Sequence, residues 1–184
     1  RAEGIRLPGV LAEQGLAHRF AGIFAGEDRS QRHMSMRIMR LDQVACLPVS
    51  PGRIRPLRED DLFFAPYWAH AFAEECGVEQ FDLSTHGERL RARIGQDTHY
   101  FWEDGVPVSQ AAHGRSTESG AVVNAVYTPP FYRGKGYATS VVSTLSRMLL
   151  ERGHRFCCLF ADAQNPISCG IYRKIGYADQ CTYD

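Results

Sequence analysis

The sequence lacks an excess of charge of either sign, since 21 basic residues stand against 21 acidic ones in a chain of 184 residues. A nucleic acid or an anionic membrane attracts proteins with a basic excess, so the composition argues against both as partners. No run approaches the roughly 18 consecutive apolar residues of a membrane span. The N-terminus does not resemble a signal peptide. We therefore expect a cytoplasmic protein without nucleic-acid or membrane partners.

Cysteine pairs with metal-binding spacing are also lacking. The six cysteines lie at positions 46, 76, 157, 158, 169 and 181, and none forms a C-x-x-C pair. Cys157 and Cys158 are adjacent in an apolar run, where a strand points them to opposite faces. Neither a zinc site nor a disulfide framework is expected, and no metal is predicted. Buried, reduced thiols fit this distribution better.

The first fifty residues differ in pattern from the rest of the chain. Residues 8–25 place leucine, isoleucine and phenylalanine at helical spacing, and the run 33–44 alternates as a strand does. The segment CLPVSPGRIRP at 46–56 has three prolines and a glycine, which indicates a boundary near residue 50. We predict that residues 1–50 are an N-terminal extension or the tail of a preceding lobe, and that 51–184 form a domain. A start at arginine instead of methionine is compatible with a piece of a longer protein.

Residues 51–184 have the pattern of an α+β domain. Three antiparallel strands are expected around the turn signals Asp104-Gly105 and Glu118-Ser119-Gly120. Strand 121–128, helix 138–152 and strand 155–161 predict a parallel βαβ unit with a right-handed crossover. The other expected elements are a strand at 53–57, helices at 58–77, 81–96 and 166–174, and a strand at 178–183. The predicted fold is a mixed, mostly antiparallel central sheet flanked by helices.

The predicted strand that ends at Thr128 leads into a glycine-rich loop and then a helix. The loop, RGKGYA at 133–138, carries two cations and no acid. Unpaired amides and the dipole at a helix N-terminus favour an anion, and glycines let the backbone approach it closely. The alternative is that Gly134 and Gly136 only form a turn. The strand–helix context favours a phosphate or pyrophosphate site.

Two common phosphate loops do not fit, because Gly136 follows Lys135 where a Walker A motif has Ser or Thr, and Thr139 stands where a Rossmann fingerprint has its third glycine. The pattern R-x-x-G-x-A instead resembles the pyrophosphate loop of the GCN5-related N-acetyltransferases, Q/R-x-x-G-x-G/A. That family's second signature, N-x-x-S-x-x-x-Y-x-x-x-G-[FY], matches NPISCGIYRKIGY at 165–177. Both motifs occur in the expected order, and the resemblance covers residues 53–183.

The resemblance implies the acyl-CoA N-acyltransferase fold and direct transfer of an acetyl group from acetyl-CoA, as co-substrate, to a primary amine. It implies that the backbone at 126–128 pairs with the pantetheine arm where two parallel strands splay apart. Amide groups there stabilise the oxyanion, and Tyr172 is the general acid for the CoA thiolate. The implied acetyl-CoA-binding residues are Val126, Tyr127, Thr128, Arg133, Gly134, Lys135, Gly136, Tyr137, Ala138 and Asn165.

Two of these residues have purely structural alternatives. Asn165 precedes Pro166, which is the pattern of a helix N-cap. Tyr172 lies two helical turns from Asn165 on the same face, where a core tyrosine with a satisfied hydroxyl is the alternative.

The general base stays unassigned. A lysine-like amine has a pKa of about 10.4 and must lose a proton before it attacks. Some family members use a glutamate on the strand that enters the loop, but Asn124 is the strongly polar residue of that strand here, and it can hold a water without accepting a proton. His113 and Glu103 are other candidates.

Three functions remain open at this point. The first is an acetyl-CoA-dependent N-acetyltransferase for a small or peptidyl amine, with a homodimer compatible with it. The second is a degenerate acyl-CoA-binding sensor or scaffold, favoured by the missing glutamate and disfavoured by the retained tyrosine. The third uses a longer acyl-CoA or an aminoacyl-tRNA, and the balanced charge disfavours the tRNA. The segment REDD at 58–61 and the pair Glu74 and Glu75 can attract a cationic amine, although acids at a helix start are also ordinary complements of its dipole.

Overall fold

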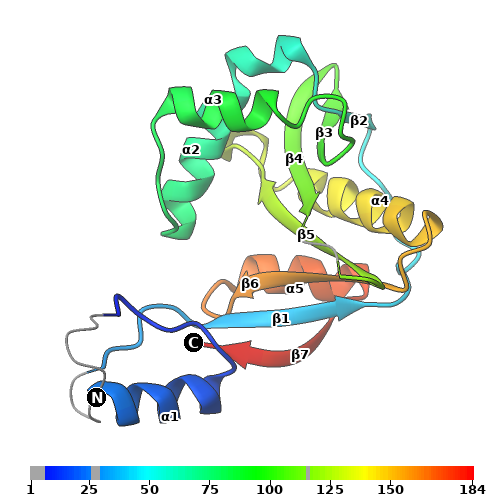
Figure 1. The fold of residues 1–184 in the computed structure, drawn as a ribbon. Coiled ribbons are helices and arrows are strands. Elements are labelled where there is room, and N and C mark those ends of the chain that lie inside the picture. The colour runs from blue at the N-terminus through cyan, green and yellow to red at the C-terminus, as the bar shows by residue number, and fades with distance from the viewer. Residues whose placement is uncertain (1–6, 26–29, 115–116) are drawn as a thin grey trace.

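A seven-stranded sheet organises the residues that the computed structural model describes, which are 7–25, 30–114 and 117–184 (Figure 1). The helices are α1 (Gln14–Ala25), η2 (Glu59–Phe63), α2 (Ala65–Cys76), α3 (Leu83–Arg91), η3 (Pro130–Tyr132), α4 (Tyr137–Glu151) and α5 (Pro166–Ile175), of which η2 and η3 are 3₁₀ turns. The strands are β1 (Met36–Leu41), β2 (Arg53–Pro56), β3 (His99–Asp104), β4 (Val106–Gly114), β5 (Gly120–Tyr127), β6 (Phe156–Asp162) and β7 (Ala178–Tyr183).

The order of strands in the sheet is β2-β3-β4-β5-β6-β1-β7. Strands β5 and β6 run parallel and are joined by α4, whereas the other neighbouring pairs within the described residues are antiparallel. This arrangement confirms the predicted α+β fold with its mixed, mostly antiparallel sheet and its parallel βαβ unit.

Two predicted helices differ in detail from those observed. The helix expected at 58–77 is divided at Phe64 into η2 and α2. Pro66 lies in the first turn of α2, and a proline there lacks the N–H that would continue the preceding turn. Gly77 ends α2 in the left-handed conformation with φ 60°, as the sequence predicted. The helix expected at 81–96 is the shorter α3.

Strand β1 lies between β6 and β7 and pairs with both (Figure 1). Its Met39 and Leu41 are completely buried and contact the main core. The helix expected at 8–25 is present but begins only at Gln14, and the strand expected at 33–44 is the shorter β1. This strand is part of the same sheet as the rest of the chain. Residues 1–6 and 26–29 of the predicted extension lie outside the described residues. The boundary near residue 50 stays a prediction.

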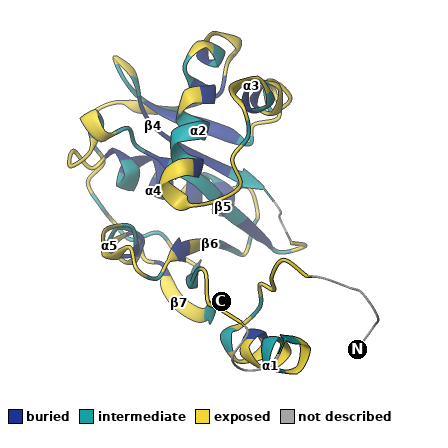
Figure 2. Cartoon of the chain, turned by 90° about the vertical axis from the view of Figure 1, so that its left-hand side faces the viewer, coloured by how far each residue is buried: buried dark blue, intermediate teal, exposed yellow. Residues whose placement is uncertain are grey.

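Each face of the sheet carries its own core. Because neighbouring residues of a strand point to opposite faces, Tyr100 and Trp102 of β3 pack into the main core with α4, while Phe101 packs with Leu90 of α3 and Trp68 of α2. The strands between the helices are accordingly buried, as Figure 2 shows for β4 and β5. The middle strands of the sheet are thus covered, whereas most residues of the edge strand β7 are exposed.

Helix α1 contributes little to either core. It follows an isolated bridge between Glu13 and Tyr183, and Ala17 is its buried residue. Leu16 and Ile23 are exposed. Among the described residues, no helix is long and apolar enough to cross a membrane.

The expectation of buried cysteines is partly wrong. All six cysteines are free, and Cys157 and Cys169 are buried, but Cys46, Cys76 and Cys181 are exposed. Adjacent Cys157 and Cys158 do differ in burial, as expected for neighbours on a strand.

Replacing Leu41 with alanine tests whether β1 is part of the stable sheet. We expect Leu41→Ala to lower the free energy of unfolding by about 2–5 kcal/mol, because it removes a fully buried side chain. Leu16→Ala on exposed α1 is the control and should change it by about 0.5 kcal/mol or less. Urea unfolding measures both, and equal small effects would contradict the placement of β1 in the core.

Candidate acyl-CoA site

The parallel strands β5 and β6 separate soon after they begin. They pair only through Gly120–Val122 and Phe156–Cys158. Further along, β5 pairs with β4 alone and β6 with β1 alone in the described part of the chain. Beyond Val122, the facing edges of β5 and β6 therefore form no backbone hydrogen bonds with each other. This separation lies where the pantetheine arm is predicted.

A backbone irregularity marks the same stretch of β5. The register between β4 and β5 shifts between Gln110 and Ala112, and Ala125 has φ 49°, which is uncommon for a residue with a side chain. The buried Gln110 donates from Nε2 to the Ala125 carbonyl at 3.4 Å. A bulge bends a strand and redirects its backbone groups, and such strained residues gather at functional sites.

The predicted pantetheine-binding residues at the end of β5 are held by hydrogen bonds. Ser109 Oγ donates to the Tyr127 carbonyl at 3.2 Å and lies 2.8 Å from Thr128 Oγ1. Arg133 Nε donates to the Thr128 carbonyl at 2.8 Å. Val126 packs against the main core. The strand therefore reaches the glycine loop in a fixed position.

The glycine loop has the conformation that its sequence requires. Gly134 and Gly136 have φ 78° and 80°, which a residue with a side chain rarely adopts. Gly136 is the N-cap of α4, and a Cβ there would lie 2.8 Å from Ser50 Oγ. Around Gly134 there is open space. The loop thus presents a bare backbone to solvent at a helix N-terminus.

Amide groups of the loop are available to a ligand. Among the described residues, no hydrogen bond to the N–H groups of residues 134–139 is found, and no side chain caps α4. Tyr137 and Ala138 contribute the first amides of the helix, which have no acceptor within it. The Tyr137 hydroxyl itself donates to Asp104 at 2.6 Å. The site is therefore made of backbone donors, which suits a phosphate oxygen.

The linker that precedes β2 fastens this loop. Ser50 Oγ donates to the Lys135 carbonyl at 2.8 Å, and the Ser50 amide donates to Ser140 Oγ of α4 at 2.8 Å. Sequence reasoning missed Ser50, because a serine in a proline-rich linker, 85 positions from Lys135, carries no local signal.

The two loop cations are engaged elsewhere in this structure. Arg133 donates to both carboxylate oxygens of Glu75, the penultimate residue of α2, at 2.8 and 2.7 Å. Lys135 Nζ lies 5.4 Å from the ring centre of Phe131 and 5.9 Å from that of Tyr132. Glu75 is a further residue whose partner the sequence did not reveal, because the two residues lie 58 positions apart.

Asn165 and Tyr172 lie on α5. Asn165 Oδ1 accepts from the Ser168 amide at 3.0 Å, so it caps the helix as predicted, while its contact with acetyl-CoA stays a prediction. Tyr172 is buried, and burial raises its pKa, helped by nearby Cys76 and Cys169. No hydrogen bond of its hydroxyl to another described residue is found. A phenol with a raised pKa stays protonated at neutral pH, as a general acid must.

The C-terminal end of α2 brings the parts of the site together. The pKa of the Cys76 thiol is raised by partial burial and by the charges of Glu75 and of Asp162 at the end of β6. Burial and the charge of Glu75 likewise raise the pKa of Tyr127 at the end of β5. Through the ion pair between Glu75 and Arg133, the end of α2 is joined to the end of β5, because Arg133 also binds the Thr128 carbonyl.

The candidate bases named from the sequence are poorly placed. Glu103 binds Arg53 and Arg55, which lower its pKa, and its strand is separated from β5 by β4. Burial lowers the pKa of His113, whose Nε2 donates to the Asp97 carbonyl at 2.8 Å. Asn124 lies on β5 opposite Ala112. The base stays unassigned.

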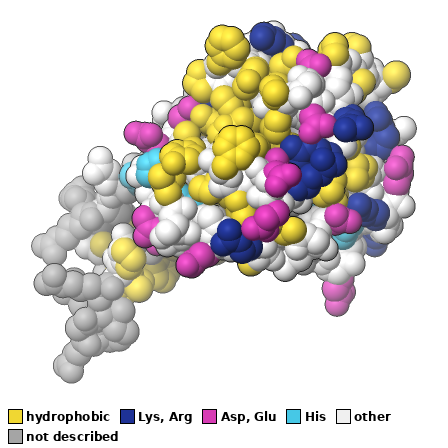
Figure 3. Space-filling model, turned by 90° about the horizontal axis from the view of Figure 1, so that it is seen from above, with side chains coloured by type: hydrophobic (Ala, Val, Ile, Leu, Met, Phe, Trp, Pro, Cys, Tyr) yellow, Lys and Arg dark blue, Asp and Glu magenta, His cyan; other side chains and the backbone are white. Residues whose placement is uncertain are grey.

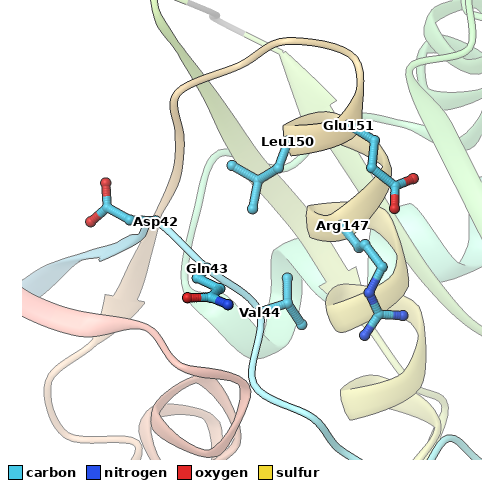
Figure 4. A pocket seen from close by; sticks show the side chains of 6 residues that line it. All are labelled: Asp42, Gln43, Val44, Arg147, Leu150 and Glu151. Atoms are coloured by element: carbon cyan, nitrogen blue, oxygen red, sulfur yellow. The ribbon is translucent and has the colours of Figure 1, made fainter.

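Two surface hollows lie away from these residues. One, of about 430 Å³, lies between the segment after β1 and the last turns of α4, at the end of that helix opposite the glycine loop (Figure 4). The other, of about 500 Å³, lies between α2 and α3. Figure 3 shows apolar side chains gathered on the end of the molecule where these two helices lie. Neither hollow includes a predicted site residue.

The described residues offer no metal centre. No group of three or more His, Cys, Asp or Glu side chains is placed within these ranges to hold a metal ion. The groups that this candidate site offers to a ligand are the backbone amides of the glycine loop, the Tyr172 phenol and the Arg133 guanidinium.

Comparison with known proteins shows which of them are similar to this chain. Residues 104–183 match the FR47-like protein family model. A GNAT-family acetyltransferase from Colwellia psychrerythraea superposes with a TM-score of 0.72 at 12% identity, over 95% of this chain and 63% of that protein. A GCN5-related N-acetyltransferase from Sphaerobacter thermophilus gives 0.72 at 17%, over 94% and 56%. A predicted acetyltransferase from Clostridium acetobutylicum, with acetyl-CoA in its structure, gives 0.54 at 18%, over 70% and 90%.

The chain has the acyl-CoA N-acyltransferase fold. The resemblance to the GCN5-related N-acetyltransferase family, seen first in its two motifs, is confirmed by the family match together with this fold. The chain spans about three fifths of the length of the first two structures. No curated protein sequence matches the chain.

Removing the hydroxyl of Tyr172 should leave the stability of the fold almost unchanged. The reason is that this hydroxyl makes no hydrogen bond to another described residue, so its removal breaks none. Tyr177→Phe is the matched control, because its buried hydroxyl lies 2.8 Å from Ser146 Oγ, and its loss should cost about 0.5–1.5 kcal/mol. Urea unfolding of both variants measures the difference. A larger loss of unfolding free energy for Tyr172→Phe than for Tyr177→Phe would show that the Tyr172 hydroxyl makes a structural hydrogen bond.

A buried histidine near the bulge should make stability depend on pH. Burial and the charge of Arg93 lower the pKa of His99 to about 4. The unfolded state, with an ordinary pKa near 6.5, binds the proton first, so stability falls as pH drops from about 6.5 towards 4. His99→Gln should reduce this slope by up to about 1.4 kcal/mol per pH unit in urea titrations. Identical slopes in both proteins would contradict the buried, neutral state.

Proposed function

We propose that this chain is an N-acetyltransferase that transfers the acetyl group of acetyl-CoA to a primary amine by direct attack. The observation that carries the proposal is the glycine loop. Its amides at residues 134–139 have no partner among the described residues, and it directly follows the strand that separates from its parallel neighbour. The family match supports the same activity, and so does the acetyl-CoA in the structure of the Clostridium acetobutylicum protein.

The residues of the chain have distinct roles in this proposal. The amides of Gly134, Gly136 and the first turn of α4 bind the pyrophosphate. The backbone at 126–128 holds the pantetheine arm, and an N–H group there stabilises the oxyanion as the carbonyl carbon is attacked. The C–N bond forms, the C–S bond breaks, and the Tyr172 phenol gives its proton to the departing thiolate. Asn165 caps α5 and so fixes the start of the helix that carries Tyr172.

The acceptor in this proposal is a small or peptidyl amine, and the reaction takes place in the cytoplasm without nucleic-acid or membrane partners. The balanced charge of the chain supports those two exclusions. A water held at Asn124 is the route we propose for the proton that the amine must lose. A homodimer is compatible with this arrangement.

A degenerate acyl-CoA-binding sensor or scaffold is the second candidate. It is favoured by the absence of a glutamate on β5 and by the two arginines that bind Glu103. The Tyr172 hydroxyl makes no hydrogen bond to another described residue, and this favours the enzyme, because a purely structural tyrosine would profit from such a bond.

Thermal shifts and turnover of Tyr172→Phe together test the proposal. Acetyl-CoA and CoA should raise the melting temperature, by the equivalent of about 2.7 kcal/mol at a hundred times Kd, whereas ATP and NAD should not. With a panel of primary amines, Tyr172→Phe should lose about a hundredfold or more in thiol release and keep its CoA affinity.

The outcomes separate the candidates. Binding without turnover in the wild type favours the sensor. No shift with either CoA species contradicts both. Tyr177→Phe is the control for effects of the hydroxyl on the core.

A further inference from the structure

We propose that Glu75 acts as a latch on Arg133, and that the pyrophosphate of an incoming acyl-CoA displaces Glu75 from this arginine. The inference rests on the proposed function, because it assumes that the glycine loop binds the pyrophosphate. It adds a residue outside both sequence motifs, on a different helix, that lowers the affinity of the free protein for its co-substrate.

Among the described residues, the contacts found for the Arg133 guanidinium are with the end of β5 and the end of α2. Its terminal nitrogen Nη2 donates to both oxygens of Glu75, its Nε donates to the carbonyl of Thr128, and its guanidinium lies 5.8 Å from the ring centre of Tyr127. These partners belong to the end of β5 and the end of α2. The cation next to Gly134 is thus committed to a carboxylate of the protein.

The position of Glu75 is unfavourable for the helix that carries it. Glu75 lies in the last turn of α2, which has no basic residue there, so its carboxylate faces the negative end of the helix dipole. The ordinary explanation for acids in a helix, that they complement the dipole of its first turn, does not apply at this end. The ion pair with Arg133 offsets the repulsion.

The ion pair is weak enough to be exchanged. The side chains of Arg133 and Glu75 are about half exposed, at 47% and 46%, and pairs of this kind contribute about 0.2–1 kcal/mol. A pyrophosphate offers a guanidinium more negative charge than one carboxylate does, and its binding to an arginine is often bidentate. The hydrogen bond from Nε to Thr128 holds the base of the guanidinium while its outer nitrogen changes partner.

Removing the carboxylate should therefore tighten CoA binding. We expect Glu75→Gln to lower the Kd for CoA about two- to fivefold in calorimetric titration, because Arg133 no longer has to leave a carboxylate. The same gain is expected with 3′-dephospho-CoA, which keeps the pyrophosphate. Circular dichroism melting confirms that each variant is folded.

Glu74→Gln is the matched control for charge. It removes the same charge one residue away, from a side chain that makes no ion pair with Arg133. We expect at most half of the gain seen with Glu75→Gln. An equal gain would show that the field of the helix end, and not the latch, sets the affinity.

A double-mutant cycle with Arg133→Gln decides the mechanism. The gain from Glu75→Gln should disappear in the Arg133→Gln background, because the latch has then lost its other half. A gain that persists there, or no gain in the wild-type background, overturns the latch. If neither the wild type nor Glu75→Gln binds CoA, the proposed function fails and the latch fails with it.

Discussion

The short parallel pairing between β5 and β6 is the constraint on which the rest of the structure depends. It begins at Gly120, where a Cβ would overlap the ring of Phe156, and it ends at Val122. A longer pairing would consume the backbone groups that the proposed function assigns to the pantetheine arm, and a missing one would separate β6, β1 and β7 from the other four strands. Three pairs hold the strands together at one end and leave them open at the other.

The elements around this opening keep it from closing or collapsing. Beyond Cys158, the edge of β6 that faces β5 is unpaired within the described residues. The opposite edge of β6 is paired with β1. Strand β5 is held by β4 through the bulge at Ala125 and by Ser109 at its end. The two strands are thus anchored separately to opposite halves of the sheet. An opening in a sheet is stable only when each side has such an anchor, because unpaired strand edges otherwise seek a partner.

The sequence predicted the elements that carry local signals. The alternation of apolar residues, the turn signals and the glycine loop all depend on neighbours within a few positions, and the corresponding strands, turns and the loop with positive φ at Gly134 and Gly136 are present. Its two motifs also pointed to the GCN5-related N-acetyltransferases, whose fold the chain has. The division of the helix predicted at 58–77 into η2 and α2 was harder to predict, because Pro66 lies inside an otherwise continuous helical pattern.

What the sequence did not predict is the pairing of distant segments. The place of β1 between β6 and β7 joins residues more than a hundred positions apart, and no spacing rule encodes that order. The same holds for Ser50 on the loop and for Glu75 on Arg133. These three contacts share one consequence, since each brings a segment from outside the two motifs onto the site that the motifs define.

The contacts with distant segments determine which charged and polar groups of the glycine loop are open to a ligand. The motif alone suggests two free cations beside the amides, which would attract any anion in the cell. In the folded chain one cation is held by a carboxylate and the other lies near aromatic rings, so the backbone amides are the groups left open. Backbone donors in a fixed loop recognise the shape of a phosphate group, whereas free cations recognise only its charge. In the protein without ligand, the distant contacts therefore leave the backbone amides, and not the two cations, as the open groups of the loop.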